Sequence, residues 1–396
     1  RVEEKMNLLS IGAILIQMLQ GSTEQEVSSV VYDSRKVEEG SLFICIRGAV
    51  VDGHKFIPDV VAKGAKTLIV EEAVEAPEDV TVIQVKDSRY AMALVAAAYY
   101  DYPGDKLRVI GITGTKGKPQ RPNMDKNPIL GKCRIDKVGL IGTIETIIGD
   151  TVIPSANTTP ESLLVQKYLR QMLDEGCDCA VMEVSSQALK YERVGNTHFD
   201  TAIFLNISKD HISPTEHKDF DDYFQSKLKI FDRCTCACVN LDSDHIGEIL
   251  KAAAKCERVV TFGSKENAVI RVSDIKPGRG KFYFHVAGPD FSEDFTLPVH
   301  GAFNVENAVA AIAAAWSMGI PVSLIKESLL GVTVPGRMET YESSAGEVTA
   351  IVDFAHNGLS FEKMFDTVAL EYPGSRVSVV FGTPGGKAFN RRKRYG

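Results

Sequence analysis

The chain has 396 residues, of which 44% are hydrophobic and 24% are charged, a composition typical of globular proteins and unlike that of fibrous or disordered ones. The length exceeds what one hydrophobic core usually serves, so we expect two or three domains. The net charge of -7 argues against nonspecific nucleic-acid binding as the main activity. No apolar run reaches the roughly 18 residues needed to cross a bilayer, and no secretion signal is recognisable, so we expect a cytoplasmic protein without a membrane partner.

The first hundred residues predict a small α/β domain. Residues 30–35 and 42–46 contain two apolar strands joined by a turn, and a helix over 56–65 leads to a strand over 67–70. An alanine-rich helix then stops near Tyr99, before Pro103 and Gly104, which marks a domain boundary. Taken alone, Asp33-Ser34-Arg35 is most simply a polar turn.

A phosphate-binding loop is predicted over residues 109–118, where a β-branched apolar run is followed by Thr-Gly-Thr-Lys-Gly-Lys. Such a loop points several backbone N–H groups into one concave space, and Lys118 adds a cation. The strict P-loop pattern has four residues between its glycines and a Ser or Thr after the lysine, whereas here five residues separate Gly111 from Gly117, and Pro119 follows Lys118. The alternative is a glycine-rich turn of an ordinary α/β protein.

No helix is predicted directly after this loop, although the dipole of such a helix would form half of an anion site. Residues 119–136 lack apolar periodicity and contain Pro122 and Pro128, each of which costs about 3 kcal/mol inside a helix. We interpret this segment as a local corruption, such as a reading-frame slip, in an otherwise coherent enzyme sequence.

Three further segments carry polar side chains suited to an active site. Residues 157–160 form a polar turn able to bind phosphate or carboxylate oxygens, and the apolar strand over 179–184 ends with Glu183. A glutamate at the end of a buried strand beside a phosphate loop is a natural Mg²⁺ ligand; the alternative is a glutamate that caps a helix. The strand over 202–207 leads to Asp210 and His211, which offer a second ligand.

The eight cysteines favour buried thiols over a metal site. Cys234, Cys236 and Cys238 alternate, which places them on one face of a strand, whereas zinc sites usually use a Cys-x2-Cys turn. Cys177 and Cys179 follow the same pattern. We therefore interpret all five as small buried hydrophobic side chains in a reducing compartment.

Seven motifs together resemble those of the Mur ligases, the ATP-dependent amide ligases of peptidoglycan precursor synthesis. In order, they are Thr113 to Lys118, Asn157 to Thr159, Met182 to Ser186, Asn206 to His211, Gly301 to Asn307, Gly336 to Glu339 and Val352 to His356. The resemblance covers essentially the whole chain and is strongest to the branch that adds the third peptide residue. It implies an α/β protein of three domains: a small UDP-substrate-binding domain over 1–103, a central P-loop-type parallel-sheet domain that binds ATP over 104–335, and a Rossmann-like ligase domain over 336–396, which we expect to be incomplete.

The resemblance also implies roles for individual residues. Catalysis would rest on Lys118, Glu183, His211 and Lys227, of which the last three would hold Mg²⁺, Lys227 as a carbamate. The residues implied to bind ATP are Gly114, Thr115, Lys116, Gly117, Lys118, Asn304, Asn307, Arg337 and Asp353. The residues implied to bind the UDP-muramoyl-peptide are Tyr32, Ser34, the loop over 49–51, Asn157, Thr158, Thr159, Ser185 and Arg193.

The implied reaction joins an amine to a carboxylate that ATP has first converted to an acyl phosphate. The acceptor would be UDP-N-acetylmuramoyl-L-alanyl-D-glutamate and the amine L-lysine or meso-diaminopimelate, with residues 210–214 favouring lysine slightly; we expect a monomer. Pro119 can supply neither the hydroxyl nor the N–H of the usual Ser or Thr, so we expect no measurable turnover. The alternatives are a noncatalytic remnant that at most binds the UDP-muramoyl-peptide and a folylpolyglutamate-synthase-like ligase, against which the N-terminal domain argues.

Overall fold

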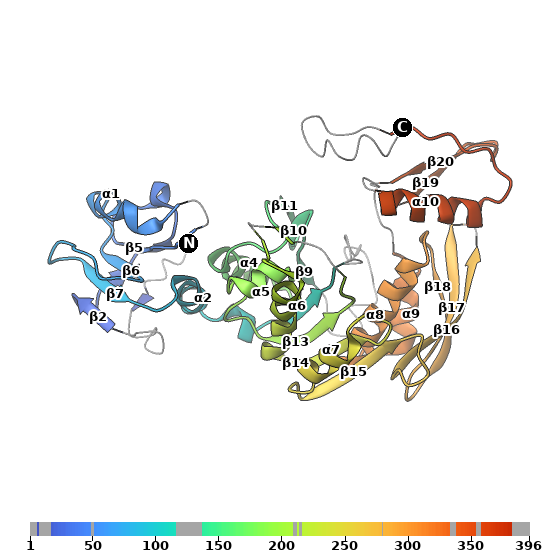
Figure 1. Ribbon diagram of the computed structural model, residues 1–396, viewed down its shortest axis with the longest axis horizontal. Coiled ribbons are helices and arrows are strands. Elements are labelled where there is room, and N and C mark those ends of the chain that lie inside the picture. Colours follow the sequence, from blue (N-terminus) through green and yellow to red (C-terminus); the bar gives the residue numbers. More distant parts are fainter. Residues whose placement is uncertain are drawn as a thin grey trace.

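The computed structural model describes residues 6–7, 17–48, 51–115, 137–208, 212–213, 216–278, 280–332, 338–353 and 358–381. Figure 1 shows a blue N-terminal body, a middle body coloured from green to orange, and a red C-terminal body that lies against the orange end of the middle body. The phosphate-loop residues 116–118 and the segment over 119–136 lie outside the described residues. In the ranges above, no helix combines the length and apolar character that crossing a membrane requires.

The N-terminal body is a five-stranded sheet with two helices packed on it. Its strand order is β2-β7-β6-β5-β4, with β4 to β7 parallel and β2 antiparallel at the edge. The bounds are β2 Gln17–Gln20, β4 Ser29–Val31, β5 Ser41–Ile44, β6 Thr67–Val70, β7 Thr81–Gln84, α1 Ile57–Ala62 and α2 Ser88–Tyr99; β1 Met6–Asn7 pairs with β3 Glu26–Val27. The predicted strands and helices of this region are thereby confirmed, and α2 ends where the alanine-rich run meets Pro103.

The middle body is built on an eleven-stranded sheet in the order β11-β10-β9-β12-β8-β13-β14-β15-β16-β17-β18. Its centre, from β9 to β16, is parallel, and both edges are antiparallel. The bounds are β8 Arg108–Thr113, β9 Val138–Ile141, β10 Glu145–Ile148, β11 Thr151–Pro154, β12 Cys179–Glu183, β13 Phe199–Phe204, β14 Cys234–Asn240, β15 Arg258–Gly263, β16 Ile270–Gly278, β17 Lys281–Ala287 and β18 Ser292–Leu297.

Helices cover both faces of this sheet, because the residues of each buried strand alternate between two apolar cores. Val109 packs into one core and Ile110 into the other. The first core is closed by α4 Ser162–Asp174, α5 Ser186–Lys190, α6 Phe220–Leu228 and α7 Ile246–Ala253, and the second by α8 Phe303–Ser317 and α9 Val322–Leu329. Trp316, the single tryptophan, joins α8 to the turn before β18 by donating from Nε1 to Asp290 Oδ1 at 2.8 Å.

The seven described cysteines are all buried with free thiols, which confirms the prediction that the alternating cysteines are buried. Burial raises the pKa of the Cys179 thiol to about 12, so this group stays protonated at neutral pH. Among the residues with described positions, no three His, Cys, Asp or Glu side chains gather as metal ligands.

The C-terminal body comprises a hairpin, β19 Glu339–Glu342 and β20 Thr349–Val352, and the helix α10 Gly358–Glu371. It is joined to the middle body through His300, whose Nδ1 pairs with Glu371 Oε2 and whose Nε2 pairs with Thr340 Oγ1. The buried strand predicted over 377–382 does not form in residues 377–381, whose side chains are exposed, that of Val380 completely. An apolar run forms a buried strand only where other elements cover it, whereas here the contact between the rings of Phe381 and Phe361 of α10 leaves Phe381 52% exposed.

Candidate active site

The candidate active site lies where β8, β12 and β13 end at the same edge of the sheet. Strand pairing sets Glu183 beside Ile112 and Phe204 beside Thr113. The residues that follow these strands therefore emerge together, at the edge where parallel α/β sheets bind their ligands.

The first residues of the phosphate loop are fixed by hydrogen bonds to both neighbouring strands. Thr113 Oγ1 donates to the Val184 carbonyl at 2.8 Å, and the Thr115 N–H donates to the Asn206 carbonyl at 3.1 Å. The Thr115 and Tyr223 hydroxyls lie 2.9 Å apart. The predicted nucleotide-binding residues Gly114 and Thr115 are thus held at the strand ends, whereas Lys116, Gly117 and Lys118 lie outside the described residues.

Lys227 lies directly beneath this loop. Its side chain is buried, and Nζ donates to the Gly114 carbonyl at 3.0 Å and to Thr113 Oγ1 at 3.3 Å. The amine also lies 5.1 Å from the centre of the Tyr223 ring, which adds a cation–π contact. Helix α6 therefore brings a buried amine to the base of the loop. As an ammonium group it is a hydrogen-bond donor and cannot bind a metal.

Glu183 is a buried carboxylate held by the turn that follows β9. It is 3% exposed and accepts hydrogen bonds from the Thr143 N–H at 3.3 Å and the Thr143 hydroxyl at 2.8 Å. The capping alternative is wrong, because Ser185 caps α5 by accepting from the Ala188 N–H at 3.1 Å. Thr143 was not predicted from the sequence.

The turn over 157–160 lies against this carboxylate. Thr159 Oγ1 donates to the Glu183 carbonyl at 2.8 Å and accepts from the Ser185 N–H at 3.0 Å. Arg193 Nη1 donates to the Thr159 carbonyl at 3.1 Å, and the Thr158 hydroxyl lies 3.1 Å from that of Thr143. The structure thus brings together Thr158, Thr159, Ser185, Arg193 and Glu183, with Asn157 exposed in the same turn. Hydroxyl, carboxylate and guanidinium groups at one sheet edge are suited to binding anions and a hard cation.

In the N-terminal body, the predicted uridine contacts begin directly after β4. The Tyr32 side chain is partly exposed. Its pKa is raised, first by the part of the side chain that is buried and second by the negative charge of Glu161. Ser34 opens a short 3-10 helix that Asp33 caps by accepting from the Arg35 N–H. The hydrogen bond from the Arg35 side chain to Asp33 lowers the pKa of Asp33 to about 2. Because Glu161 belongs to the middle body, Tyr32 lies on the side of the N-terminal body that faces it.

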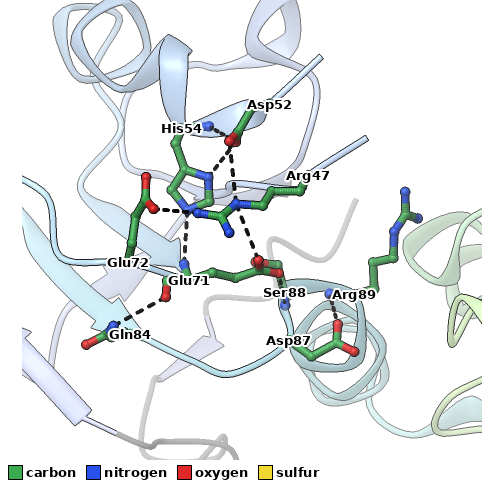
Figure 2. A network of polar contacts seen from close by, with 9 residues as sticks. All are labelled: Arg47, Asp52, His54, Glu71, Glu72, Gln84, Asp87, Ser88 and Arg89. Carbon is green, nitrogen blue, oxygen red and sulfur yellow. Dashed lines mark hydrogen bonds and ion pairs between the residues drawn. The ribbon is translucent and has the colours of Figure 1, made fainter. Parts of the chain in front are cut away.

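A polar network supports the neighbouring loop, of which Val51 is described and residues 49–50 are not (Figure 2). Arg47 Nε lies 3.4 Å from Asp52 Oδ2, and its guanidinium also pairs with Glu72. His54 Nδ1 lies 2.6 Å from Asp52 Oδ1, while Nε2 accepts the Glu71 N–H at 3.0 Å. Because a backbone N–H can only donate, Nε2 is the unprotonated nitrogen and Nδ1–H donates to Asp52. None of the residues of this network was predicted from the sequence.

The remaining predicted nucleotide contacts are only partly described. Asn304 and Asn307 lie on successive turns at the start of α8, where Nδ2 of Asn307 approaches Oδ1 of Asn304 at 3.4 Å. Asp353 follows β20 and accepts from the Met338 N–H at 2.9 Å. His211 and Arg337 lie outside the described residues.

Comparison with known protein families shows to which family the chain belongs. Residues 112–315, more than half of the chain, match the Mur ligase middle domain. The chain belongs to the Mur ligase family. Its residues 26–100 match the Mur ligase family catalytic domain, and residues 336–396 match the Mur ligase glutamate ligase domain.

Curated relatives of this Mur ligase include two clostridial proteins named UDP-N-acetylmuramoyl-L-alanyl-D-glutamate–2,6-diaminopimelate ligase. The relative from Clostridioides difficile is 40% identical over 99% of this chain and 80% of its own length. The relative from Clostridium perfringens is 36% identical over 96% of this chain and 78% of its own length.

Solved structures confirm the three-domain fold. A structure titled with the same enzyme name matches 93% of this chain and 75% of its own, with a TM-score of 0.78 at 23% identity. Folylpolyglutamate synthase from Mycobacterium tuberculosis, complexed with ADP, matches 71% of this chain and 70% of its own, with a TM-score of 0.57 at 19% identity.

Proposed function

We propose that this Mur ligase uses ATP to join 2,6-diaminopimelate to UDP-N-acetylmuramoyl-L-alanyl-D-glutamate, a step of peptidoglycan precursor synthesis. The observation that carries the proposal is the identity of 40% along 99% of the chain to a relative with that named activity. The relatives' names also favour diaminopimelate over the lysine that residues 210–214 slightly favoured. The folylpolyglutamate alternative is not retained, because its match leaves more of the chain uncovered.

The reaction must turn a poor electrophile into a good one. Transfer of the terminal phosphoryl group of ATP to the substrate carboxylate gives an acyl phosphate, and the amine then displaces phosphate through a tetrahedral intermediate. Negative charge builds up on the phosphoryl oxygens, so the backbone N–H groups of the loop and Lys118 are the proposed stabilising groups. On the acceptor side, Thr158, Ser185 and Arg193 are the proposed anion contacts, because their side chains gather beside Glu183.

Among the described residues, one side chain is suited to act as a ligand of a Mg²⁺ ion. Glu183 offers a buried carboxylate whose orientation Thr143 fixes, and hard oxygen ligands of this kind suit Mg²⁺. When bound, the ion would neutralise charge on the phosphoryl oxygens. Lys227 fits only as a carbamate, since its amine is a donor, and its burial at the base of the loop supports that proposal. His211 stays a prediction. With ATP and a UDP-linked acceptor as substrates, we propose a cytoplasmic, monomeric enzyme.

The test measures phosphate release from ATP in the presence of UDP-N-acetylmuramoyl-L-alanyl-D-glutamate and either diaminopimelate or lysine. Because Pro119 is predicted to abolish turnover, Pro119→Thr is assayed in parallel. We expect no phosphate release from the unaltered chain, and release by Pro119→Thr that requires both the acceptor and diaminopimelate would locate the defect at Pro119. Robust turnover by the unaltered chain would contradict the interpretation of Pro119, and failure of both proteins to bind the acceptor in calorimetry would refute the proposed function.

A further inference from the structure

The N-terminal and middle bodies meet along a packed helix pair, α2 against α4. Leu163, in the first turn of α4, packs against the apolar core of the N-terminal body. Beside this contact, Arg89 in the first turn of α2 reaches across to Glu161, the residue directly before α4. The junction therefore combines apolar packing with a charged contact at the end that faces the candidate site.

Glu161 divides its carboxylate between two arginines from different bodies. Oε2 lies 3.1 Å from Arg89 Nη1, and Oε1 lies 2.9 Å from Arg193 Nη2. Arg193 directs its other terminal nitrogen to the Thr159 carbonyl at 3.1 Å. One carboxylate thus links the N-terminal body to the guanidinium that lies against the substrate turn.

Glu161 is not held in place by helix capping through its side chain. It occupies the N-cap of α4 but makes no capping hydrogen bond with its side chain, although N-cap residues usually do so. The side chains of Arg89, Glu161 and Arg193 are 22%, 19% and 15% exposed, so solvent screens this cluster much less than an ordinary surface pair. Arg89 is further fixed because its guanidinium lies 5.1 Å from the centre of the Tyr191 ring.

We propose that Glu161 is a positioning residue that docks the N-terminal body onto the middle body and holds Arg193 in place for the acceptor substrate. This inference rests on the proposed function. The acceptor carries UDP at one end, near Tyr32 and Ser34, and its reacting carboxylate at the other, near Glu183. The affinity of the protein for the acceptor therefore depends on how the N-terminal body is placed relative to the middle body, whereas free UDP binds to the N-terminal body alone.

The ligand test uses this difference. Glu161→Gln keeps the size of the side chain but removes the charge that both arginines share. We expect the variant to bind UDP-N-acetylmuramoyl-L-alanyl-D-glutamate about tenfold more weakly in calorimetry, with binding of free UDP changed less than about twofold. A purely structural defect in the N-terminal body would weaken the binding of both ligands alike. Arg89→Gln should likewise weaken binding of the acceptor but not of free UDP. The double variant should bind the acceptor little more weakly than either single variant does.

The matched control is Asp101→Asn, which removes an ion pair with Arg170 at the same junction together with a local pair to Lys106. Asp101 pairs with Arg170 of α4 at 3.3 Å, but its side chain is 58% exposed. Exposed pairs contribute little, so we expect this variant to bind both ligands as the unaltered protein does.

A ligand-free measurement tests docking separately. In hydrogen exchange, Glu161→Gln should exchange faster than the unaltered protein in peptides covering residues 86–93 and 157–165, while Asp101→Asn should not. Unchanged exchange in Glu161→Gln, or equal weakening of UDP and the full acceptor, would overturn the positioning role. If the unaltered protein binds no acceptor, the proposed function fails, and the exchange result still decides whether Glu161 docks the two bodies.

Discussion

His300 is predicted to hold the C-terminal body on the middle body, and His300→Phe should release it. The imidazole is 6% exposed, and its partner Glu371 has a completely buried side chain. The second carboxylate oxygen, Oε1, is also buried and has no hydrogen-bond partner among the described residues. Loss of the imidazole would therefore leave a buried charge without compensation, which costs about 3–5 kcal/mol. The loss of the hydrogen bond between Thr340 and His300 would cost less, because the Thr340 hydroxyl can still donate to the Met338 carbonyl at 3.0 Å.

The assay is hydrogen exchange in peptides covering β19, β20 and α10. A loss of about 3 kcal/mol in the free energy of opening lowers protection by about two orders of magnitude. The double variant His300→Phe, Glu371→Leu replaces both partners by apolar groups and should recover most of that protection, since exchanging a buried pair for hydrophobic residues is often nearly neutral. Wild-type protection in His300→Phe, or additive losses in the double variant, would refute the reasoning.

Three further predictions concern packing and ionisation. Gly139→Ala places a Cβ 2.3 Å from a methionine sulfur of α4 and should cost about 1–3 kcal/mol, whereas Gly247→Ala meets nothing within 4 Å in α7 and should gain about 0.5–1 kcal/mol; thermal unfolding followed by circular dichroism measures both. Cys179, whose pKa is raised to about 12 by burial, should resist iodoacetamide at pH 8 in the native protein and react once urea unfolds it, as mass spectrometry would show; alkylation of the folded protein would contradict its burial. In Arg35→Ala, the pKa of Asp33 should rise from about 2 towards its ordinary value of about 3.9, as measured by NMR of labelled aspartate. Since that pKa is lowered, the contribution of Asp33 to stability is complete above about pH 4 and is lost as the pH falls through 2.

Much of the fold was predictable because its strands carry their own signals. The apolar runs at 67–70 and 179–184 became β6 and β12 with a change of at most one residue in their bounds. Val377 to Phe381 carry the same signal but are exposed, because an apolar run records only the potential for burial and the partners that cover it lie elsewhere in the chain. The domain boundaries at 103 and 335 stay predictions.

The site was predictable where motif residues follow parallel strands. Glu183 and Ser185 lie together at the end of the parallel strand β12, and Thr159, in the turn after β11, bonds to both of their backbones. Thr143 and Glu161 were not predicted, since their partners are distant in the sequence and no local pattern distinguishes them from ordinary turn residues. The roles of Lys227 and Arg193 came from resemblance alone and stay proposals.

Trp316 provides an intrinsic fluorescence signal from a single position in the protein. The only indole of the chain sits on α8 in the middle body, anchored to Asp290, so the emission seen on selective excitation comes from one body of the three. A nucleotide that alters this fluorescence must act on the surroundings of that helix, whereas a ligand confined to the N-terminal sheet should leave the signal unchanged. Binding events at opposite ends of the molecule can thus be told apart without any added dye.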